Sequence, residues 1–457
     1  MRILLVQPNT STLRGTLCPP IGLMYVGAVA REAGHEVKIL DRNIDYFSLT
    51  KMKRFKPDIV GITSMTGPML LDAVHVSRKT KEILGKDTPV VWGGVHASIL
   101  PGETLQNDYI DYVVVGEGEY TFLQLVEALD NGSGEIGTIH GLAFKESGKV
   151  KINEPRPVLK NLDVLPYLPW DLVNAEKYFD IEIVLVSSRG CPFSCSFCLS
   201  GRKGPEHRYR SFSAERVVEE IKRIEKLTRN RHLKFHDDFF TSNHEYCKKI
   251  FENLSSEYSL LLYTRVTFID DKFLEMLGGF KRVWLSFGVE SGSERMLRKY
   301  NKKITIQQIR DAFALCRKQK NIRTKASVIL GAPTETREEI DMTLNLMKEI
   351  NPTRHTYCVY TPYPGSELYD EAVQSNLFHP PETIEGWADV TMHGIDSSRT
   401  LGIDQKFLRN IDNRGWLVNL NNIIQEGEWY KLVQRIKDYD PFLIKVFNKI
   451  EEMLVYR

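Results

Sequence analysis

Short apolar runs alternate with amphipathic segments over the first third of the chain. The apolar runs are four to six residues long and are found at Ile3–Gln7, Val37–Asp41, Ile59–Ser64, Val90–Gly94 and Tyr112–Val115. Segments with helical spacing, such as Ile21–Ala33, separate them. This rhythm predicts parallel strands joined by helices. We therefore expect an α/β fold in which residues 1–134 form a doubly wound, Rossmann-like parallel sheet that binds ligands at the carboxyl ends of its strands.

A second series of apolar runs begins after residue 180. Its predicted strands are Ile183–Ser187, Leu233–His236, Leu260–Arg265, Val283–Ser286, Arg323–Leu330 and Tyr357–Tyr360. Six strand–helix units predict a partial (β/α)6 barrel over residues 181–375, with its chemistry at the carboxyl face. Between the two series, residues 135–180 predict a hairpin around Ser147-Gly148 and a linker interrupted by prolines. Residues 376–457 are expected to form a mostly helical C-terminal domain that caps the barrel mouth.

The composition is that of an ordinary globular protein. The chain has 457 residues, 42% of them hydrophobic, and a formal net charge of +2. Such a balance gives no field that favours nucleic acid. We expect a cytoplasmic protein with no integral membrane segment, because the N-terminus starts on a strand pattern and no apolar run has the length of a bilayer span.

Three cysteines after the first strand of the second series carry the strongest chemical signal. Cys191, Cys195 and Cys198 have the spacing C-x3-C-x2-C. Three thiolates can hold three irons of a 4Fe–4S cluster and leave the fourth iron open to a small molecule. A zinc site completed by His207 is an alternative, as is a chance grouping. A disulfide framework is disfavoured by seven cysteines in a chain of this length.

Polar residues and glycines follow the predicted strands of the first series. They are Ser64, Gly93, Gly94, His96, Gly116 and Glu117. Glycines at a strand end let the backbone approach a bulky ligand. A dinucleotide is disfavoured because no G-x-G-x-x-G follows the first strand. His96 is expected either to touch the ligand or to lie as a solvated loop histidine.

These residues resemble the cobalamin-binding domain found at the N-terminus of many radical S-adenosylmethionine (radical SAM) enzymes. The matching segments are Pro19–Leu23, Gly34–Val37, Ser64-Met65, Gly93–His96 and Gly116–Glu119. The resemblance implies that Ser64 and Gly93-Gly94 cradle the nucleotide tail of cobalamin. The D-x-H-x-x-G motif is absent from the first loop, so no histidine of that loop is expected to ligate the cobalt. The alternative is a Rossmann-like domain that holds nothing.

The second half resembles the radical SAM superfamily. The motif C-x3-C-x-aromatic-C is complete, with Phe197 as the aromatic residue. Further matches are Arg208–Ser211, Asp237-Asp238, Gly288–Gly292, Val328–Thr334 and Tyr363–Tyr369. The resemblance implies a 4Fe–4S cluster whose open iron chelates S-adenosylmethionine and a 5′-deoxyadenosyl radical that abstracts hydrogen from a carbon.

The resemblance also implies roles for single residues. Phe197 would pack near the adenine, Glu290 would hold the ribose or the amino group, and Arg265 would bind the carboxylate. Ser286 is expected to point toward the same ligand. An equal alternative is that Arg265 and Glu290 form a salt bridge with each other. Tyr360 and Tyr363 are the candidate catalytic residues, which either line the substrate space or fill it.

Both resemblances together imply a cobalamin-dependent radical SAM methyltransferase that methylates an unactivated carbon by way of methylcobalamin. A cobalamin-linked cyclase or rearrangement enzyme is the alternative, followed by a non-catalytic iron–sulfur protein for electron transfer or sensing. The partners expected are an external one-electron reductant, such as flavodoxin or ferredoxin, and a substrate that is a small molecule, a lipid or a peptide side chain.

Overall fold

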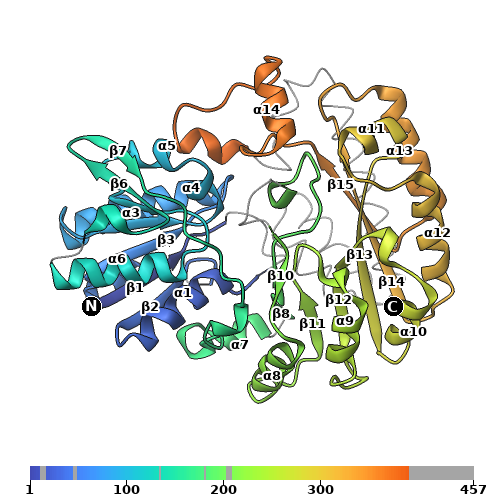
Figure 1. Cartoon of the computed structure of the whole chain (residues 1–457), viewed down its shortest axis with the longest axis horizontal. Coiled ribbons are helices and arrows are strands. Elements are labelled where there is room, and N and C mark those ends of the chain that lie inside the picture. The colour runs from blue at the N-terminus through green and yellow to red at the C-terminus, as the bar shows by residue number, and fades with distance from the viewer. Residues whose placement is uncertain (11–16, 45–48, 133–134, 180–181, 202–207, 391–457) are drawn as a thin grey trace, which may run out of the picture.

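The chain folds into two α/β halves that lie side by side (Figure 1). The computed structural model describes residues 1–457 except 11–16, 45–48, 133–134, 180–181, 202–207 and 391–457. The predicted α/β fold class is confirmed, with an N-terminal sheet followed by an open barrel.

The N-terminal sheet has seven strands in the order β2-β1-β3-β4-β5-β6-β7. Five are parallel, namely β1 (Arg2–Gln7), β2 (Glu36–Asp41), β3 (Ile59–Thr63), β4 (Val90–Gly93) and β5 (Tyr112–Val114). The predicted hairpin, β6 (Leu142–Glu146) and β7 (Lys149–Ile152), pairs antiparallel with β5. The hairpin therefore extends the first sheet at its edge, which the sequence pattern did not predict.

Helices cover both faces of this sheet. Their bounds are α1 (Ile21–Glu32), α2 (Leu49–Phe55), α3 (Met69–Leu84), α4 (Val95–Ile99), α5 (Pro101–Leu105) and α6 (Glu119–Asn131). Leu5 and Val91 belong to one hydrophobic core with α1 and α6, whereas Leu4 and Trp92 belong to a second core with α3. Neighbouring strand residues thus point to opposite faces, as a doubly wound sheet requires.

The second sheet has six parallel strands in the order β15-β14-β13-β12-β11-β8. Their bounds are β8 (Ile183–Leu185), β11 (His232–Phe235), β12 (Ser259–Thr264), β13 (Arg282–Glu290), β14 (Ile322–Leu330) and β15 (Arg354–Val359). The two end strands, β8 and β15, do not pair with each other. The predicted partial barrel is confirmed. Short α7 (Ala175–Phe179) precedes it, and β9 (Ser188–Arg189) pairs with β10 (Arg210–Ser211) beside it.

The strands of the barrel have an apolar outer face and a polar inner face. Every second residue of β14 is buried, from Ile322 to Leu330, and the residues between them are half-buried. The buried set packs against helices on the outside of the barrel. These helices are α8 (Ala214–Glu225), α9 (His244–Phe251), α10 (Asp271–Leu277), α11 (Glu294–Lys299), α12 (Ile306–Arg317) and α13 (Arg337–Ile350). We call the other side of the six strands the inner face.

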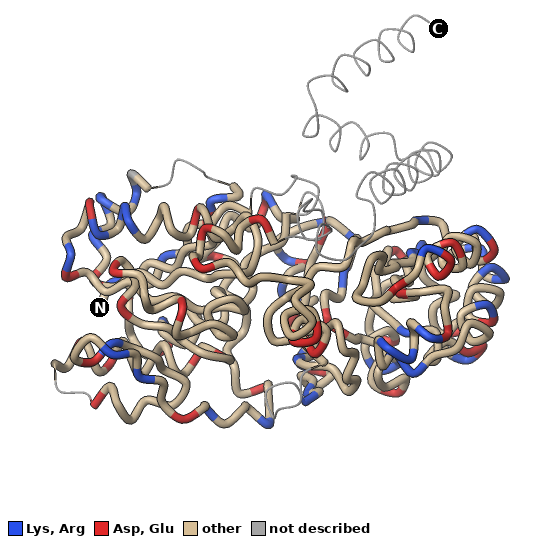
Figure 2. The backbone as a smooth tube through the Cα atoms, turned by 90° about the horizontal axis from the view of Figure 1, so that it is seen from above, with Lys and Arg blue, Asp and Glu red and all other residues tan. Residues whose placement is uncertain are grey.

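The described end of the chain returns to the N-terminal half. After α14 (Glu367–Gln374), a 3-10 turn at Glu385–Asp389 places Trp387 in the core beside α3, where it is 1% exposed. Residues 378–390 thus pack on the first sheet. The helices expected after residue 390 lie outside the described residues. No described helix has the length and apolarity needed to cross a membrane. Basic and acidic side chains are mixed over both halves (Figure 2).

Candidate active site

The cysteine loop follows the first barrel strand and is held by contacts with the segment after α11. The amide of Ser196 donates to the carbonyl of Tyr300 at 3.0 Å, and Asn301 Nδ2 donates to the carbonyl of Ser194 at 2.6 Å. Gly201 passes so close to Cys195 that a Cβ would lie 2.5 Å from the Cys195 carbonyl oxygen. A glycine is therefore needed for the loop to fold back over the second cysteine.

The three thiols share one electrostatic environment. The pKa of Cys191 is raised to about 11, chiefly by burial and to a smaller extent by Asp238, Cys198 and Cys195, although a backbone hydrogen bond from Phe193 opposes the rise. Burial also raises the pKa of Cys198. No three Cys, His, Asp or Glu side chains in the described ranges converge on a single metal ion. In a cubane cluster each thiolate binds a different iron, so three soft donors on one loop fit such a group. His207, the alternative zinc ligand, lies outside the described residues.

Arg265 packs directly against the cysteine loop. Its guanidinium lies 3.7 Å above the ring centroid of Phe193, and its Nη1 lies 3.9 Å from Cys195 Sγ. Its Nη2 donates to the carbonyl of Lys302. The Nε is buried and has no hydrogen-bond partner among the described residues. This arrangement places a fixed cation beside the second cysteine.

Glu290 is paired with Lys302. Glu290 Oε1 lies 2.7 Å from Lys302 Nζ, and both side chains are 9% exposed. The residue has a positive φ of 63° next to an irregularity in the β13–β14 register. A Cβ at Gly288 would collide with both charged groups. The predicted alternative of an Arg265–Glu290 salt bridge is wrong, because the nearer cation is Lys302.

The sequence analysis missed Lys302. This lysine follows α11 in a polar segment, Asn301–Lys303, that resembles a solvated loop. One signal could have found it, because a carboxylate in the barrel mouth needs a buried cation as its partner. Lys302 also connects Glu290 with Phe197, since its Nζ lies 5.8 Å from the Phe197 ring centroid.

The remaining predicted residues of the barrel are Phe197, Tyr360, Tyr363 and Ser286. Phe197 packs edge-on against Tyr300, and Tyr360 belongs to the same buried cluster. Tyr360 is 2% exposed, which favours the packing interpretation over a substrate contact. Tyr363 lies in the turn before α14, where its carbonyl accepts from Ser366. Ser286 lies buried on the inner face, two residues before Gly288.

The first sheet has a cavity of about 380 Å³ at the carboxyl ends of its strands. Four of the predicted residues line it, namely Gly93, Gly94, Gly116 and Glu117. Most of the other lining residues are apolar, including Leu5, Ile21, Val91 and Phe122. A largely apolar cavity of this size at the strand ends fits a flat aromatic group such as the nucleotide base of cobalamin.

Ser64 and His96 lie beside this cavity but do not line it. The Ser64 hydroxyl donates to the Gly93 carbonyl at 2.8 Å and accepts from the Ala97 amide. The expectation that His96 lies in a solvated loop is wrong, and its contact with a ligand stays a prediction. His96 is 1% exposed within α4 and hydrogen bonds through Nδ1 with Thr66 Oγ1 at 3.0 Å. Both residues therefore shape the turn that carries Gly93 and Gly94.

Ion pairs join the rim of the cavity to the cysteine side of the barrel. Glu117 accepts two hydrogen bonds from Arg210, at 2.7 and 3.1 Å, and Arg189 binds Glu119 at 2.5 Å. The pKa of Glu117 is lowered overall, because its pairing with both arginines outweighs its burial. Arg189 and Arg210 flank the cysteine loop, on β9 and β10. The strand ends of the two halves are thereby held facing each other.

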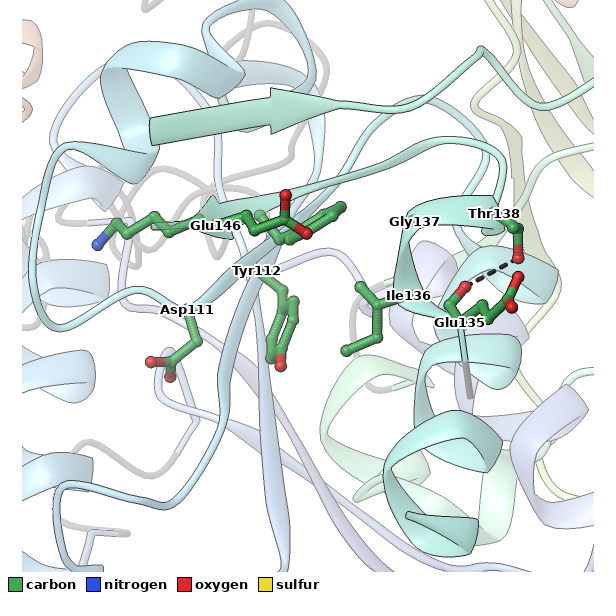
Figure 3. A pocket seen from close by; sticks show the side chains of 9 residues that line it. Asp111, Tyr112, Glu135, Ile136, Gly137, Thr138 and Glu146 are labelled. Carbon is green, nitrogen blue, oxygen red and sulfur yellow. Dashed lines mark hydrogen bonds between the residues drawn. The ribbon is translucent and has the colours of Figure 1, made fainter. Parts of the chain in front are cut away.

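A larger groove of about 650 Å³ lies at the hairpin edge of the first sheet (Figure 3). Its lining includes Asp111, Tyr112, Glu135 and Glu146. Lys145, which also lines it, donates its ammonium to the carbonyls of Asn107 and Ile110. Neither the cysteines nor the strand-end glycines reach this groove, so it does not belong to the site described above.

A Rossmann-like sheet with a strand-end cavity, joined to an open barrel with a three-thiol loop, defines the class of radical SAM enzymes that bind cobalamin. Family models agree with this architecture: residues 12–126 match the B12 binding domain and residues 185–347 match the Radical SAM superfamily. The chain is also similar over most of its length to known proteins.

An uncharacterized methyltransferase, PH0819 of Pyrococcus horikoshii, is 38% identical over 394 residues, which cover 82% of this chain and 84% of the relative. An anaerobic magnesium-protoporphyrin IX monomethyl ester cyclase of Rubrivivax gelatinosus is 30% identical over 400 residues, or 81% and 70% of the two chains. The solved radical SAM methyltransferase TsrM of Kitasatospora setae has the same fold, with a TM-score of 0.71, 20% identity and coverage of 83% and 77%. The chain belongs to the family of B12-binding radical SAM enzymes, and its cofactors are a 4Fe–4S cluster, S-adenosylmethionine and cobalamin.

Proposed function

We propose that this protein is a methyltransferase that adds a methyl group to an unactivated carbon of its substrate. The observation that carries this proposal is the pairing of Glu117 with Arg210, which holds the strand-end cavity of one half against the cysteine side of the other. A methyl carrier in the first half and a radical source in the second would then serve one substrate. The relative with 38% identity is named a methyltransferase, which supports the same function.

When bound, the cluster and S-adenosylmethionine supply a radical that takes hydrogen from carbon, and cobalamin supplies the methyl group. Cys191, Cys195 and Cys198 would hold three irons. We propose that Glu290 binds the ammonium of S-adenosylmethionine and that Lys302 binds its carboxylate. The two buried side chains already form an ion pair with each other, so each carries the charge that its proposed ligand group needs. Phe197 beside them would pack on the adenine.

The role that we propose for Arg265 differs from the one that the resemblance to radical SAM enzymes implied, which was to bind the carboxylate of S-adenosylmethionine. Its guanidinium is fixed between the Phe193 ring and the carbonyl of Lys302, within 3.9 Å of Cys195 Sγ. A cation in that place stabilises the anionic thiolate and holds the cysteine loop in position. On the cobalamin side, Gly93, Gly94, Gly116 and Glu117 would line the space for the nucleotide tail.

The proposed electron donor is an external one-electron reductant such as flavodoxin or ferredoxin. The proposed localisation is the cytoplasm, where such reductants occur.

The test uses the anaerobically reconstituted full chain, S-adenosylmethionine labelled in its methyl group, and an extract of the host. We expect 5′-deoxyadenosine, S-adenosylhomocysteine and a labelled product, all detected by mass spectrometry. Cys195→Ala should abolish 5′-deoxyadenosine, and Cys247→Ala, which changes a buried cysteine of α9, should not. Turnover of a substrate with 5′-deoxyadenosine but without label or S-adenosylhomocysteine would indicate the cyclase or rearrangement alternative.

A further inference from the structure

The cysteine loop begins and ends on a two-stranded ladder, which we call the loop stem. β9 leads into the loop, β10 leads out of it, and their antiparallel register places Arg189 opposite Arg210. On the barrel side, the carboxylate of Asp237 accepts a hydrogen bond from the amide of Ser187, just before the stem, at 3.0 Å. Cys191 follows Arg189 by two residues, so the position of its thiol depends on where the stem is held.

The other two cysteines of the loop are held by the barrel. The amide of Ser196, which lies between Cys195 and Cys198, donates to the carbonyl of Tyr300 at 3.0 Å. This contact fixes the second part of the loop to the segment that follows α11. A cubane cluster held by three cysteines needs all three thiolates in place at once. Its assembly therefore depends on the loop stem and on the barrel together.

Carboxylates of the first half bind the two arginines of the loop stem. Glu117 Oε1 lies 2.7 Å from Arg210 Nη2 and 3.4 Å from Arg189 Nη1, so one carboxylate binds both guanidinium groups. Glu119 accepts a further hydrogen bond from Arg189 at 2.5 Å. Guanidinium groups on opposed residues repel each other unless anions compensate them. The first half thus supplies the negative charge that stabilises the stem.

The residues that hold the loop stem also line the strand-end cavity. The lining includes Glu117, Glu119 and Arg189, together with the glycines on either side of Glu117, Gly116 and Gly118. Gly116 has a φ of 81°, and neither glycine has a side chain that could anchor the turn. A group that fills the cavity therefore restricts this turn and, with it, the Glu117 carboxylate.

We infer that the cavity and the cluster site are energetically coupled through Glu117. Cobalamin bound in the cavity strengthens the hold on the loop stem and so stabilises the cluster, and the bound cluster tightens the binding of cobalamin, because coupling between two sites is reciprocal. Glu117 is a positioning residue in this scheme, since it acts on Cys191 through Arg189 and Arg210. The inference rests on the proposed function, which assigns the cavity to the nucleotide tail of cobalamin and the loop to the cluster.

Two physical effects give the coupling its sign. The first ligand to bind orders the turn and the side chain of Glu117, so the second ligand binds to groups that have already lost this conformational freedom. A ligand in the cavity also displaces water beside Glu117 and Arg189, and an ion pair is stronger where the local dielectric constant is lower. Both effects favour binding of the two cofactors together over binding of either one alone.

The first experiment measures the Kd of hydroxocobalamin for the full chain with and without its reconstituted cluster, by anaerobic equilibrium dialysis. In the wild type we expect the cluster to lower this Kd by about 5-fold or more. Equal Kd values for the two forms of the wild type would overturn the inference. This comparison needs no variant, so it stands even where a substitution prevents folding.

Variants then test whether Glu117 carries the coupling. In Glu117→Gln the ratio of the two Kd values should fall to about 1, while a direct contact of residue 117 with cobalamin changes both values alike and cancels in the ratio. The ratio should persist in Glu127→Gln, at an exposed position of α6, and in Tyr178→Phe, which removes another contact between the halves, the hydrogen bond to Asp41. A ratio that persists in Glu117→Gln, or that is lost in Tyr178→Phe as well, would overturn the assignment to Glu117.

The second experiment observes the coupling from the cluster. The reconstituted protein is mixed with an iron chelator, with or without hydroxocobalamin, and the coloured complex of released iron is followed over time. Cobalamin should slow the loss of iron from the wild type and have no effect on Glu117→Gln. Equal rates with and without cobalamin in the wild type would overturn the inference. Neither experiment contains a substrate, so their outcome is independent of whether the protein transfers a methyl group.

Discussion

At the residue scale, the site depends on charged and polar groups that the fold removes from water. Glu290 and Lys302 are both 9% exposed, and Arg265 is 7% exposed. Buried charges are tolerated when they are paired, and removing one partner leaves the other uncompensated. Stability and ligand binding are therefore linked at the same few side chains.

Replacing Lys302 by methionine should destabilise the protein by about 3 kcal/mol or more, because Glu290 is left as an unpaired buried carboxylate. Binding of S-adenosylmethionine should also weaken. Urea unfolding and equilibrium dialysis measure the two effects. The adjacent Lys303→Met, at an exposed position, is the matched control and should change neither quantity appreciably. Equal behaviour of the two variants would contradict the assigned pairing.

His96 predicts a pH dependence of stability. Burial lowers its pKa to about 4 in the folded protein, whereas an unfolded histidine titrates near 6.5. Between these values the unfolded chain takes up a proton that the folded protein does not, so stability falls as the pH falls. At pH 5 the loss relative to pH 7 amounts to about 2 kcal/mol.

The measurement compares the wild type with His96→Gln by urea unfolding at pH 7, 6 and 5. Other titrating groups are shared by both proteins and cancel in the difference. The wild type should lose more stability than the variant on acidification. Two parallel pH profiles would show that His96 is not the group responsible.

At the scale of elements, the strand ends create both halves of the site. β3 and β4 end in a turn where Gly94 has φ of 85° and its backbone touches Ser64. β8 ends just before the cysteine loop, and β13 ends in the bulge that carries Glu290. Regular strands thus end in irregular backbone at each place where a cofactor is proposed to bind.

Gly94→Ala tests the first of these turns. A Cβ at Gly94 would lie 2.6 Å from the Ser64 carbonyl oxygen, and the backbone conformation is one that side chains rarely adopt. We expect a loss of about 2 kcal/mol or more of stability and reduced retention of cobalamin on gel filtration. Gly102→Ala, in α5, is the control because no atom lies within 4 Å of its added Cβ. Full cobalamin retention in Gly94→Ala would contradict this assignment.

At the scale of the molecule, the two halves are joined by polar as well as apolar contacts. Besides the pairs of Glu117 and Glu119 with arginines, Tyr178 donates to Asp41 at 2.5 Å. One continuous core includes Leu5 of the first sheet and Leu233 of the second. The two sets of strand ends are thereby fixed relative to each other, which a shared substrate requires.

Glu117→Gln should weaken this junction by about 1–3 kcal/mol, because Arg210 loses its carboxylate partner and Arg189 keeps only Glu119. The pKa of Glu117 is lower in the folded protein than in the unfolded chain. Its contribution is therefore present above the unfolded value, near 4.3, and is lost as the pH falls through the folded value. A double-mutant cycle with Arg210→Gln at pH 7 measures the coupling, and Glu127→Gln, at an exposed position of α6, is the control. A coupling energy near zero would show that the pair does not hold the halves together.

The sequence alone determined the two βα series, the cysteine motif and the class of cofactors. These features are local: alternation of apolar runs follows from which residues face a sheet, and the ligand spacing lies within eight residues, Cys191–Cys198. Four of the residues predicted for the cobalamin site line the cavity. Each of these four lies at the end of a strand or just after it, and strand ends can be predicted from the local sequence pattern.

Only the tertiary structure decided which distant side chains meet. Lys302 pairs with Glu290, Arg210 joins the other half of the molecule through Glu117, and His96 turns away from the cavity into the core. Such pairings join residues far apart in the chain. The free energy of burying a charge depends on what the fold places beside it, and local sequence patterns do not encode that neighbour.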